Sequence, residues 1–220
     1  MALKALYQLE DLNDSSGNGY NLTNYNSVTF TAGKFANCAN FGNPNTTKCL
    51  YVANALGITN GAITMMGWLQ ILSTAGGRIF AKGNTTNYVE YIIDYTSTTI
   101  SAIRCKPNVG SNTATYTYSL ATGKWYHIAL VYDTTNIIMY VNGYAGATAA
   151  ASGNGTSTPD TTANNFTMGS WLSRAGGFAP ILIDKVSVYD SALSPSQIMS
   201  EYRKGFPLGG GIAIGSPAMY

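Results

Sequence analysis

Apolar and polar residues alternate along most of the chain, in short runs bounded by Gly, Asn, Asp and Pro. This alternation predicts half-buried β-strands, because successive side chains of a strand point to opposite faces of its sheet. The clearest run is Trp125–Val131, followed by a polar turn, by Ile137–Val141 and, after Asn142-Gly143, by a strand beginning at Tyr144. Asn-Gly favours a tight hairpin turn, so these segments predict a three-stranded meander. Further predicted strands are Ala5–Leu9, Phe35–Phe41, Cys49–Ala53, Ile63–Leu72, Arg78–Ala81, Tyr88–Asp94, Thr99–Lys106, Ala114–Ser119, Phe166–Gly169 and Ile181–Tyr189.

A helix is predicted only late in the chain, over Ser194–Lys204. Its serine can cap the first turn, Pro195 suits the first helical position, and Gln197 completes a capping box. Residues 205–220 are too rich in glycine for a regular element. We therefore predict one domain over residues 1–204, an all-β two-sheet sandwich with a short C-terminal helix, and a tail or linker over 205–220.

Charged residues make up only 10% of the 220 residues, and the formal net charge is +2. An average soluble domain has roughly 25% charged residues. Without a dense basic surface, nucleic-acid binding is not expected. The sequence shows no apolar run long enough to span a membrane and no visible export signal. Solubility must then come from Asn, Thr, Ser and Gly, a composition that favours an extracellular protein or the surface of a virion.

The three cysteines, Cys38, Cys49 and Cys105, are too few for a disulfide scaffold. With His127 as the only histidine, they also make a poor zinc site. Cys38 and Cys49 flank a segment that reads as a hairpin loop, so a disulfide between them is geometrically possible. The alternative is two buried thiols that pack as small apolar side chains.

Six motifs in order along the chain resemble the laminin-G-like, concanavalin A-like lectin/glucanase jelly-roll family. They are Asp14-Ser-Ser-Gly-Asn-Gly19, Gly33-Lys-Phe-Ala-Asn-Cys-Ala-Asn-Phe-Gly42, Ile63-Thr-Met-Met-Gly-Trp68, Gly123-Lys-Trp-Tyr-His-Ile-Ala-Leu-Val-Tyr-Asp133, Tyr140-Val-Asn-Gly143 and Ile183-Asp-Lys-Val-Ser-Val-Tyr-Asp-Ser-Ala-Leu-Ser194. The resemblance covers about residues 3–204 and implies the jelly-roll fold. That fold carries lectins, adhesion modules, glycan-cleaving enzymes and structural domains, so function has to be argued from the site.

The resemblance also implies a structural calcium ion between the early turn and an acid on the last strand. In this sequence the ligands would be Asp14, Asn18 and Asp184 together with backbone carbonyls. Lys185 stands where the family usually has a second acid. The alternative is a hydrogen-bonded Asx turn at Asp14, with Asp184 satisfied by backbone amides.

Catalysis is not expected. Glycoside hydrolysis needs two carboxyl groups about 5 to 9.5 Å apart. Glu90 and Asp94 are the only two acids spaced along one strand face, and at about 3.3 Å per residue they lie roughly 13 Å apart. His127 shares a strand face with Trp125, Ala129 and Val131, so we predict a packed structural histidine rather than a catalytic base.

Sugars are bound by aromatic faces together with polar groups that reach hydroxyls. Trp68 and Trp125 lie in apolar strands and are predicted to be core residues. Trp171 instead begins a loop that contains Arg174 and two adjacent glycines, so we predict that Trp171 and Arg174 contact a ligand. The alternative is loop packing or an interface with another chain. Further candidates, on one sheet surface, are Tyr88, Glu90, Arg104 and Tyr116.

Together these features predict a non-catalytic recognition or adhesion module that binds glycans or a cell surface. The alternative is a structural or decoration component of a phage-like virion or another extracellular assembly, whose glycine-rich tail docks on neighbouring protein subunits. A glycan hydrolase or lyase would require two converging acids, or a Tyr/His pair, in an open cleft.

Overall fold

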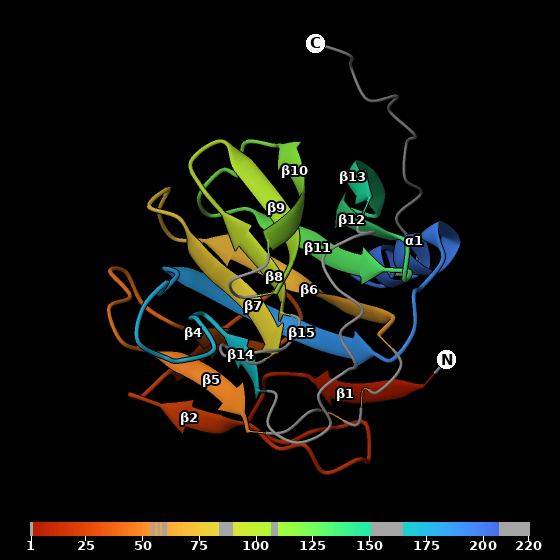
Figure 1. Cartoon of the computed structure of the whole chain (residues 1–220). Helices are drawn as coiled ribbons and strands as arrows, with labels where there is room; N and C mark the ends of the chain where they lie inside the picture. The colour runs from red at the N-terminus through yellow and green to blue at the C-terminus, as the bar shows by residue number, and fades with distance from the viewer. Residues whose placement is uncertain are drawn as a thin grey trace.

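The computed structural model describes residues 2–53, 56, 58, 61–83, 90–106, 110–150 and 165–206, excepting the side chains of residues 90, 105, 106 and 110. Its strands form two stacked antiparallel sheets (Figure 1). In spatial order, sheet A contains β13 (Tyr144–Ala150), β12 (Asn136–Val141), β11 (Trp125–Tyr132), β6 (Ile63–Ile71), β15 (Ile181–Tyr189), β4 (Asn37–Asn40) and β3 (Thr29–Ala32), with β1 (Leu3–Tyr7) paired to β15. Sheet B contains β10 (Gly110–Thr117), β9 (Thr99–Lys106), β8 (Glu90–Tyr95), β7 (Gly77–Gly83), β14 (Asn165–Met168), β5 (Cys49–Val52) and β2 (Thr23–Tyr25). The predicted all-β sandwich is confirmed.

The hydrophobic core lies between the sheets, where alternate residues of facing strands interdigitate. Tyr7, Phe41, Phe80 and Phe166 are fully buried there. The rings of Tyr7 and Phe166 stack with centroids 6.2 Å apart and thereby join the two sheets. This aromatic centre stabilises the sandwich because it removes large apolar surfaces from water.

Helix α1 (Pro195–Arg203) lies on the outer face of sheet A, beside β12 and β13 (Figure 1). Ser194 and Gln197 form the predicted capping box. Ile198 is buried and belongs to a second apolar cluster that covers this face of the sheet. His127 is 2% exposed next to the helix, which confirms the predicted packed histidine. No helix in the described ranges is long and apolar enough to cross a membrane.

One local prediction was wrong, and one open alternative is decided. The segment between Cys38 and Cys49 does not close a hairpin, because β4 pairs with β3 and β15 in sheet A, whereas β5 pairs with β14 and β2 in sheet B. Turn-forming residues suit a crossover between layers as well as a hairpin, and the pattern cannot distinguish the two. The structure has Cys38 and Cys49 as free, buried thiols, while the side chain of Cys105 lies outside the described residues.

Other local differences lie at the margins of the fold. β2 and β3 were not predicted, since these short edge strands bury little apolar surface. Trp68 is buried as predicted, but on the outer face of sheet A rather than between the sheets. Gly205 and Phe206, predicted to begin the tail, pack against Trp68. Gly205 and Phe206 therefore belong to the packed part of the chain.

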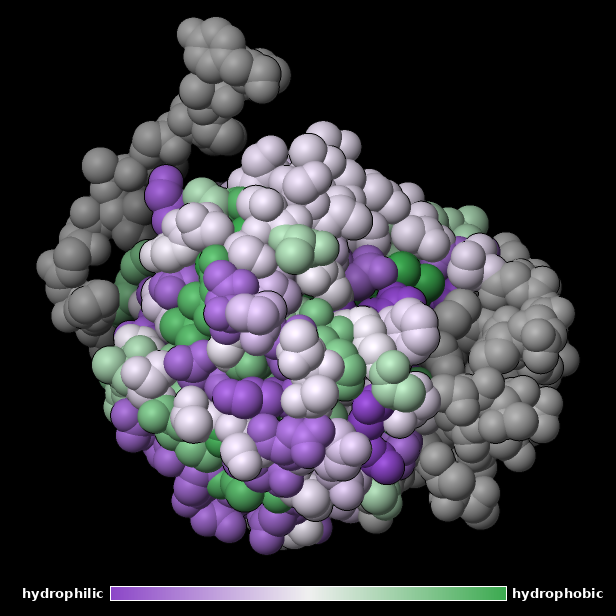
Figure 2. Space-filling model, turned by 90° about the vertical axis from the view of Figure 1, so that its left-hand side faces the viewer, coloured by the Kyte–Doolittle hydropathy of each residue, from purple (hydrophilic) through white to green (hydrophobic). Residues whose placement is uncertain are grey.

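The face shown in Figure 2 is a mosaic of strongly polar and apolar residues, with wide pale areas of intermediate hydropathy. Pale areas are what Thr, Ser, Gly and Tyr produce, since these residues lie near the middle of the scale. The wide pale areas of this face agree with the low charged fraction of the sequence, 10%.

Candidate ligand-binding site

The loop between β14 and β15, residues 169–180, is fixed to β7 at both of its ends. The Gly169 amide donates to the Ile79 carbonyl at 2.9 Å, and the Arg78 amide donates to the Gly177 carbonyl at 2.9 Å. Within the loop, the Trp171 amide donates to the Gly176 carbonyl, also at 2.9 Å. Backbone bonds at each end give this loop a defined position over sheet B.

Trp171 is 49% exposed, so part of its indole surface is open to solvent. The indole lies over Gly176 and Gly177, and a Cβ atom at Gly177 would overlap it. Gly177 also has φ +62°, a conformation that favours glycine. The two adjacent glycines noted in the sequence therefore make room for the ring and hold it in place.

Beside Trp171 lies a shallow cavity of about 160 Å³, which we call the Trp171 cleft. Its lining residues are Gly77, Arg78, Asp94, Tyr95, Trp171 and Gly177. Arg78 Nη1 and Asp94 Oδ2 form an ion pair at 2.9 Å with both side chains partly exposed. Burial raises the pKa of Asp94, and Arg78 opposes that effect only in part. The cleft thus places a donor and an acceptor next to an aromatic face, a combination that suits sugar hydroxyls.

Arg174 lies on the same loop but contacts different strands. Its guanidinium lies 4.2 Å from the ring centroid of Tyr51 and 5.8 Å from that of Tyr25. It adopts φ +57° at the turn of the loop. Arg174 does not line the Trp171 cleft; its stacking on Tyr51 instead fastens the loop to β5. This stacking corresponds to the alternative given above for Arg174, which was loop packing rather than ligand contact.

Of the four residues of the second predicted surface, the two whose side chains are described point inward. Arg104 pairs in register with Tyr91 and points inward, where its guanidinium lies 4.8 Å from the Tyr132 ring of sheet A. Tyr116 also points inward and packs against Gly146 of β13. Arginine and tyrosine were assigned to the surface because they are polar, but aromatic rings shelter both groups at this end of the sandwich. Tyr88 and the side chain of Glu90 lie outside the described residues.

Two of the predicted calcium ligands, Asp14 and Asn18, make hydrogen bonds within the protein. Asp14 Oδ1 accepts from the Leu6 and Ser16 amides, and Oδ2 accepts from the Ser16 hydroxyl and the Tyr20 amide. Burial alone would raise the pKa of Asp14, but these hydrogen bonds hold it below its ordinary value. Asn18 directs its amide nitrogen to backbone carbonyls, as a donor.

Asp184 lies elsewhere, where its Oδ2 accepts from the amides of Lys34 and Phe35 at 2.8 and 3.1 Å. Its burial raises its pKa. The described residues contain no group of three or more His, Cys, Asp or Glu side chains that could hold a metal ion. The other oxygen, Asp184 Oδ1, is buried without a hydrogen-bond partner, whereas both carboxylate oxygens of Asp14 accept hydrogen bonds. Asp14, Asn18 and Asp184 as arranged thus offer one unpartnered carboxylate oxygen, fewer than the six to eight oxygens that calcium takes. The chelation experiment below tests whether calcium binds.

Sequence reasoning did not identify Arg78, Asp94 and Tyr95 as neighbours of Trp171. Arg78 and Asp94 lie at the ends of two predicted strands and face each other across the β7–β8 pair. Opposite charges at adjacent strand ends were the available signal. The strand register needed to use that signal includes a bulge between Arg78 and Phe80, which the sequence pattern does not show.

Residues 41–199 match the Laminin_G_3 family model, described as the concanavalin A-like lectin/glucanases superfamily. This chain belongs to that superfamily. Comparison with curated protein sequences finds no match at the significance required. The family match spans the sheets that carry the Trp171 cleft, but it does not specify a ligand.

Solved structures with the same fold include domain 4 of AbnA, an extracellular arabinanase of family GH43 from Geobacillus stearothermophilus, in complex with arabinotriose. That domain is 20% identical with a TM-score of 0.70, over 90% of this chain and 97% of the domain. The binding domain of Paraclostridial Mosquitocidal Protein 1 is 13% identical with a TM-score of 0.71, over 92% of this chain. The binding domain of botulinum neurotoxin serotype D, in complex with N-acetylneuraminic acid, is 14% identical with a TM-score of 0.71, over 91% of this chain. This chain spans about half the length of these toxin domains, 52% and 50% respectively.

Proposed function

We propose that this protein is a non-catalytic, extracellular carbohydrate-binding module, and that the Trp171 cleft holds one sugar ring of an oligosaccharide. The observation that carries the proposal is a half-exposed indole fixed beside the Arg78–Asp94 ion pair. A sugar can stack its C–H face on the ring while its hydroxyls reach the guanidinium and the carboxylate. The cleft is small and open, so neighbouring sugar units would extend into solvent.

The comparisons support this proposal because two of the structures with the same fold were solved with bound sugars. The arabinanase domain was solved with arabinotriose, and this chain covers nearly all of it. A toxin binding domain was solved with N-acetylneuraminic acid, although this chain matches only half of that domain. The reported structures are described as binding domains or as one domain of a larger enzyme. A role in recognition therefore agrees with them better than a role in catalysis. The alternative of a virion component stays a prediction.

Isothermal titration calorimetry with arabinotriose, preceded by a glycan array to widen the ligand search, tests the proposal. Trp171→Ala is expected to weaken binding about tenfold or more, since removing an aromatic contact of this kind costs on the order of 1 kcal/mol or more. Tyr144→Ala is the matched control, because Tyr144 is a 65% exposed aromatic residue on sheet A, away from the cleft. An array without hits, or equal losses in the two variants, would reject the proposal.

A further inference from the structure

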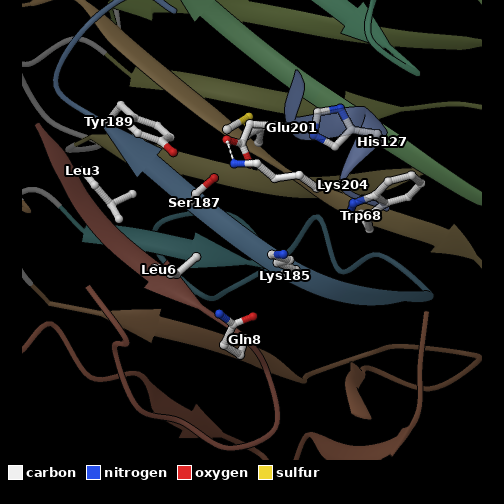
Figure 3. A pocket seen from close by; sticks show the side chains of 11 residues that line it. Leu3, Leu6, Gln8, Trp68, His127, Lys185, Ser187, Tyr189, Glu201 and Lys204 are labelled. Carbon is white, nitrogen blue, oxygen red and sulfur yellow. Dashed lines mark hydrogen bonds and ion pairs between the residues drawn. The ribbon is translucent and has the colours of Figure 1, made fainter. Parts of the chain in front are cut away.

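A second cavity lies on the outer face of sheet A, between β1 and α1, with β15 as its floor (Figure 3). We call it the α1 groove. Its volume is about 290 Å³, larger than that of the Trp171 cleft. Small-molecule pockets begin at roughly 300 Å³, so this groove suits one small molecule rather than a long chain. Leu3 and Leu6 form one wall, and Glu201 of α1 and the C-cap residue Lys204 lie opposite (Figure 3).

The polar part of the groove includes buried groups. His127 is 2% exposed, and its Nδ1 atom has no hydrogen-bond partner. Ser187, on the floor, is 8% exposed. Folded proteins satisfy nearly all buried polar atoms, since leaving one unpaired costs free energy. His127 lines the cavity, and its unpaired, buried Nδ1 is a position that a ligand hydroxyl satisfies after a small movement of the ring.

The floor of the groove has a specific backbone feature. Asp184 pairs with Trp68, and Ser187 pairs with Met66, so β15 holds one residue more than β6 between these pairs. This bulge contains Lys185, which has φ +46°, an uncommon conformation for a lysine. Bulges of this kind redirect side chains next to binding sites. Here the bulge brings the Lys185 ammonium to the groove, 4.8 Å from the Phe35 ring.

Charge in the groove favours an anion. Lys185 and Lys204 both line it, and Glu201, which pairs with Lys204, is the one acid among the lining residues. The other polar lining groups are Gln8, Ser187 and the phenol of Tyr189 (Figure 3). This set offers an excess of donors, together with amide and hydroxyl groups that suit neutral oxygens.

Trp68 does not act as a stacking platform here. Tyr202 stacks on it at 5.8 Å between centroids, and the Lys34 ammonium lies 4.2 Å from its ring. A ligand of the α1 groove must then be recognised by polar groups, in contrast to one held against the open indole of Trp171. That difference makes the two cavities chemically distinct.

From these observations we propose that the α1 groove is a second binding site, for a sugar acid whose carboxylate lies between Lys185 and Lys204 and whose hydroxyls reach Ser187, Gln8 and His127 Nδ1. A carboxylate bound by two ammonium groups gains charge-assisted hydrogen bonds, and a single pyranose ring matches the volume. The proposal does not rest on the Trp171 cleft.

The test uses D-glucuronic acid and D-galacturonic acid as ligands and D-glucose as the neutral comparison. Nitrogen-15 NMR of the imidazole gives an unambiguous signal, because His127 is the only histidine. We expect at least one of the acids to shift the Nδ1 resonance in a saturable manner and to bind about tenfold more tightly than glucose, as one charged contact allows. Lys185→Gln should remove that advantage, while Lys124→Gln, an exposed lysine outside the groove, should retain it.

The proposal is overturned if neither acid shifts the imidazole nitrogen, if glucose binds as tightly as the acids, or if Lys185→Gln and Lys124→Gln behave alike. Ser187→Ala is a second variant, expected to weaken binding without changing the charge of the groove. Titrating the Trp171→Ala variant with the same acids separates the two sites. If this variant loses binding while Lys185→Gln keeps it, the acid binds in the Trp171 cleft and the groove proposal is refuted.

Discussion

His127 makes the stability of the protein depend on pH in a way that can be calculated. Burial lowers the pKa of its imidazole from 6.5 to about 4. The folded protein therefore keeps the ring neutral at pH 5, whereas the unfolded chain protonates it. Because the unfolded state binds more protons, the free energy of unfolding falls as pH falls from 6.5 towards 4, and the contribution is fully present above pH 6.5.

The size of the effect follows from the same values. Each pKa unit corresponds to 1.36 kcal/mol, so complete protonation costs about 3 kcal/mol. Between pH 7 and pH 5 the expected loss is about 2 kcal/mol from this one group. Replacing His127 by glutamine removes the titration, so the variant should lose about 2 kcal/mol less than the natural protein over the same interval.

Urea unfolding followed by tryptophan fluorescence at pH 7, 6 and 5 measures both proteins. Carboxyl groups such as Asp94 and Asp184, whose pKa values are raised by burial, also titrate towards acid pH. They are present in both proteins and cancel in the difference. Equal slopes of stability against pH would refute the calculation. If the glutamine variant does not fold, an NMR pH titration of His127 in the natural protein replaces the unfolding comparison. A titration midpoint near pH 6.5 would then contradict the lowered pKa of His127.

Three further outcomes are expected. Gly146→Ala should destabilise the fold by about 1–3 kcal/mol, because the new methyl group would overlap the Tyr116 ring; an unchanged urea midpoint would show that these groups are farther apart. Gly177→Ala should displace the Trp171 indole and abolish sugar binding while costing only about 1 kcal/mol of stability, so retained affinity in calorimetry would count against the cleft. EDTA should leave the thermal midpoint unchanged, since hydrogen bonds already occupy both oxygens of Asp14; a fall that added calcium reverses would restore the metal site.

Alternation and turn chemistry were sufficient to predict a two-sheet sandwich, the late helix and most strands. Ser194 and Gln197 show why, because a capping box depends on residues three apart and on no distant contact. Edge strands β2 and β3 were missed because they bury little and leave only a weak pattern. The layer of β5 was also missed, because strand pairing depends on contacts far apart in sequence.

The candidate sites were predictable only in part. Trp171 was identified because a tryptophan beside two glycines in a polar loop is unusual, but its neighbours depend on the register of β7 with β8. Arg104 was placed on the wrong face, because side-chain polarity was taken as exposure at a position where the guanidinium lies over Tyr132. The α1 groove was not predicted at all. It requires β1, β15 and α1 to meet, and no local pattern encodes that meeting.

The bonds that fasten the loop to β7 run from backbone to backbone at Gly169 and Gly177, so they do not depend on the side chains between them. The exposed positions 171, 173 and 175 can consequently be exchanged, much as antibody loops vary on a constant framework, while buried Leu172 and the stacked Arg174 are kept. A library randomised over these three positions would sample new specificities on the same scaffold. The loop between β14 and β15 is therefore a suitable place to introduce new binding residues.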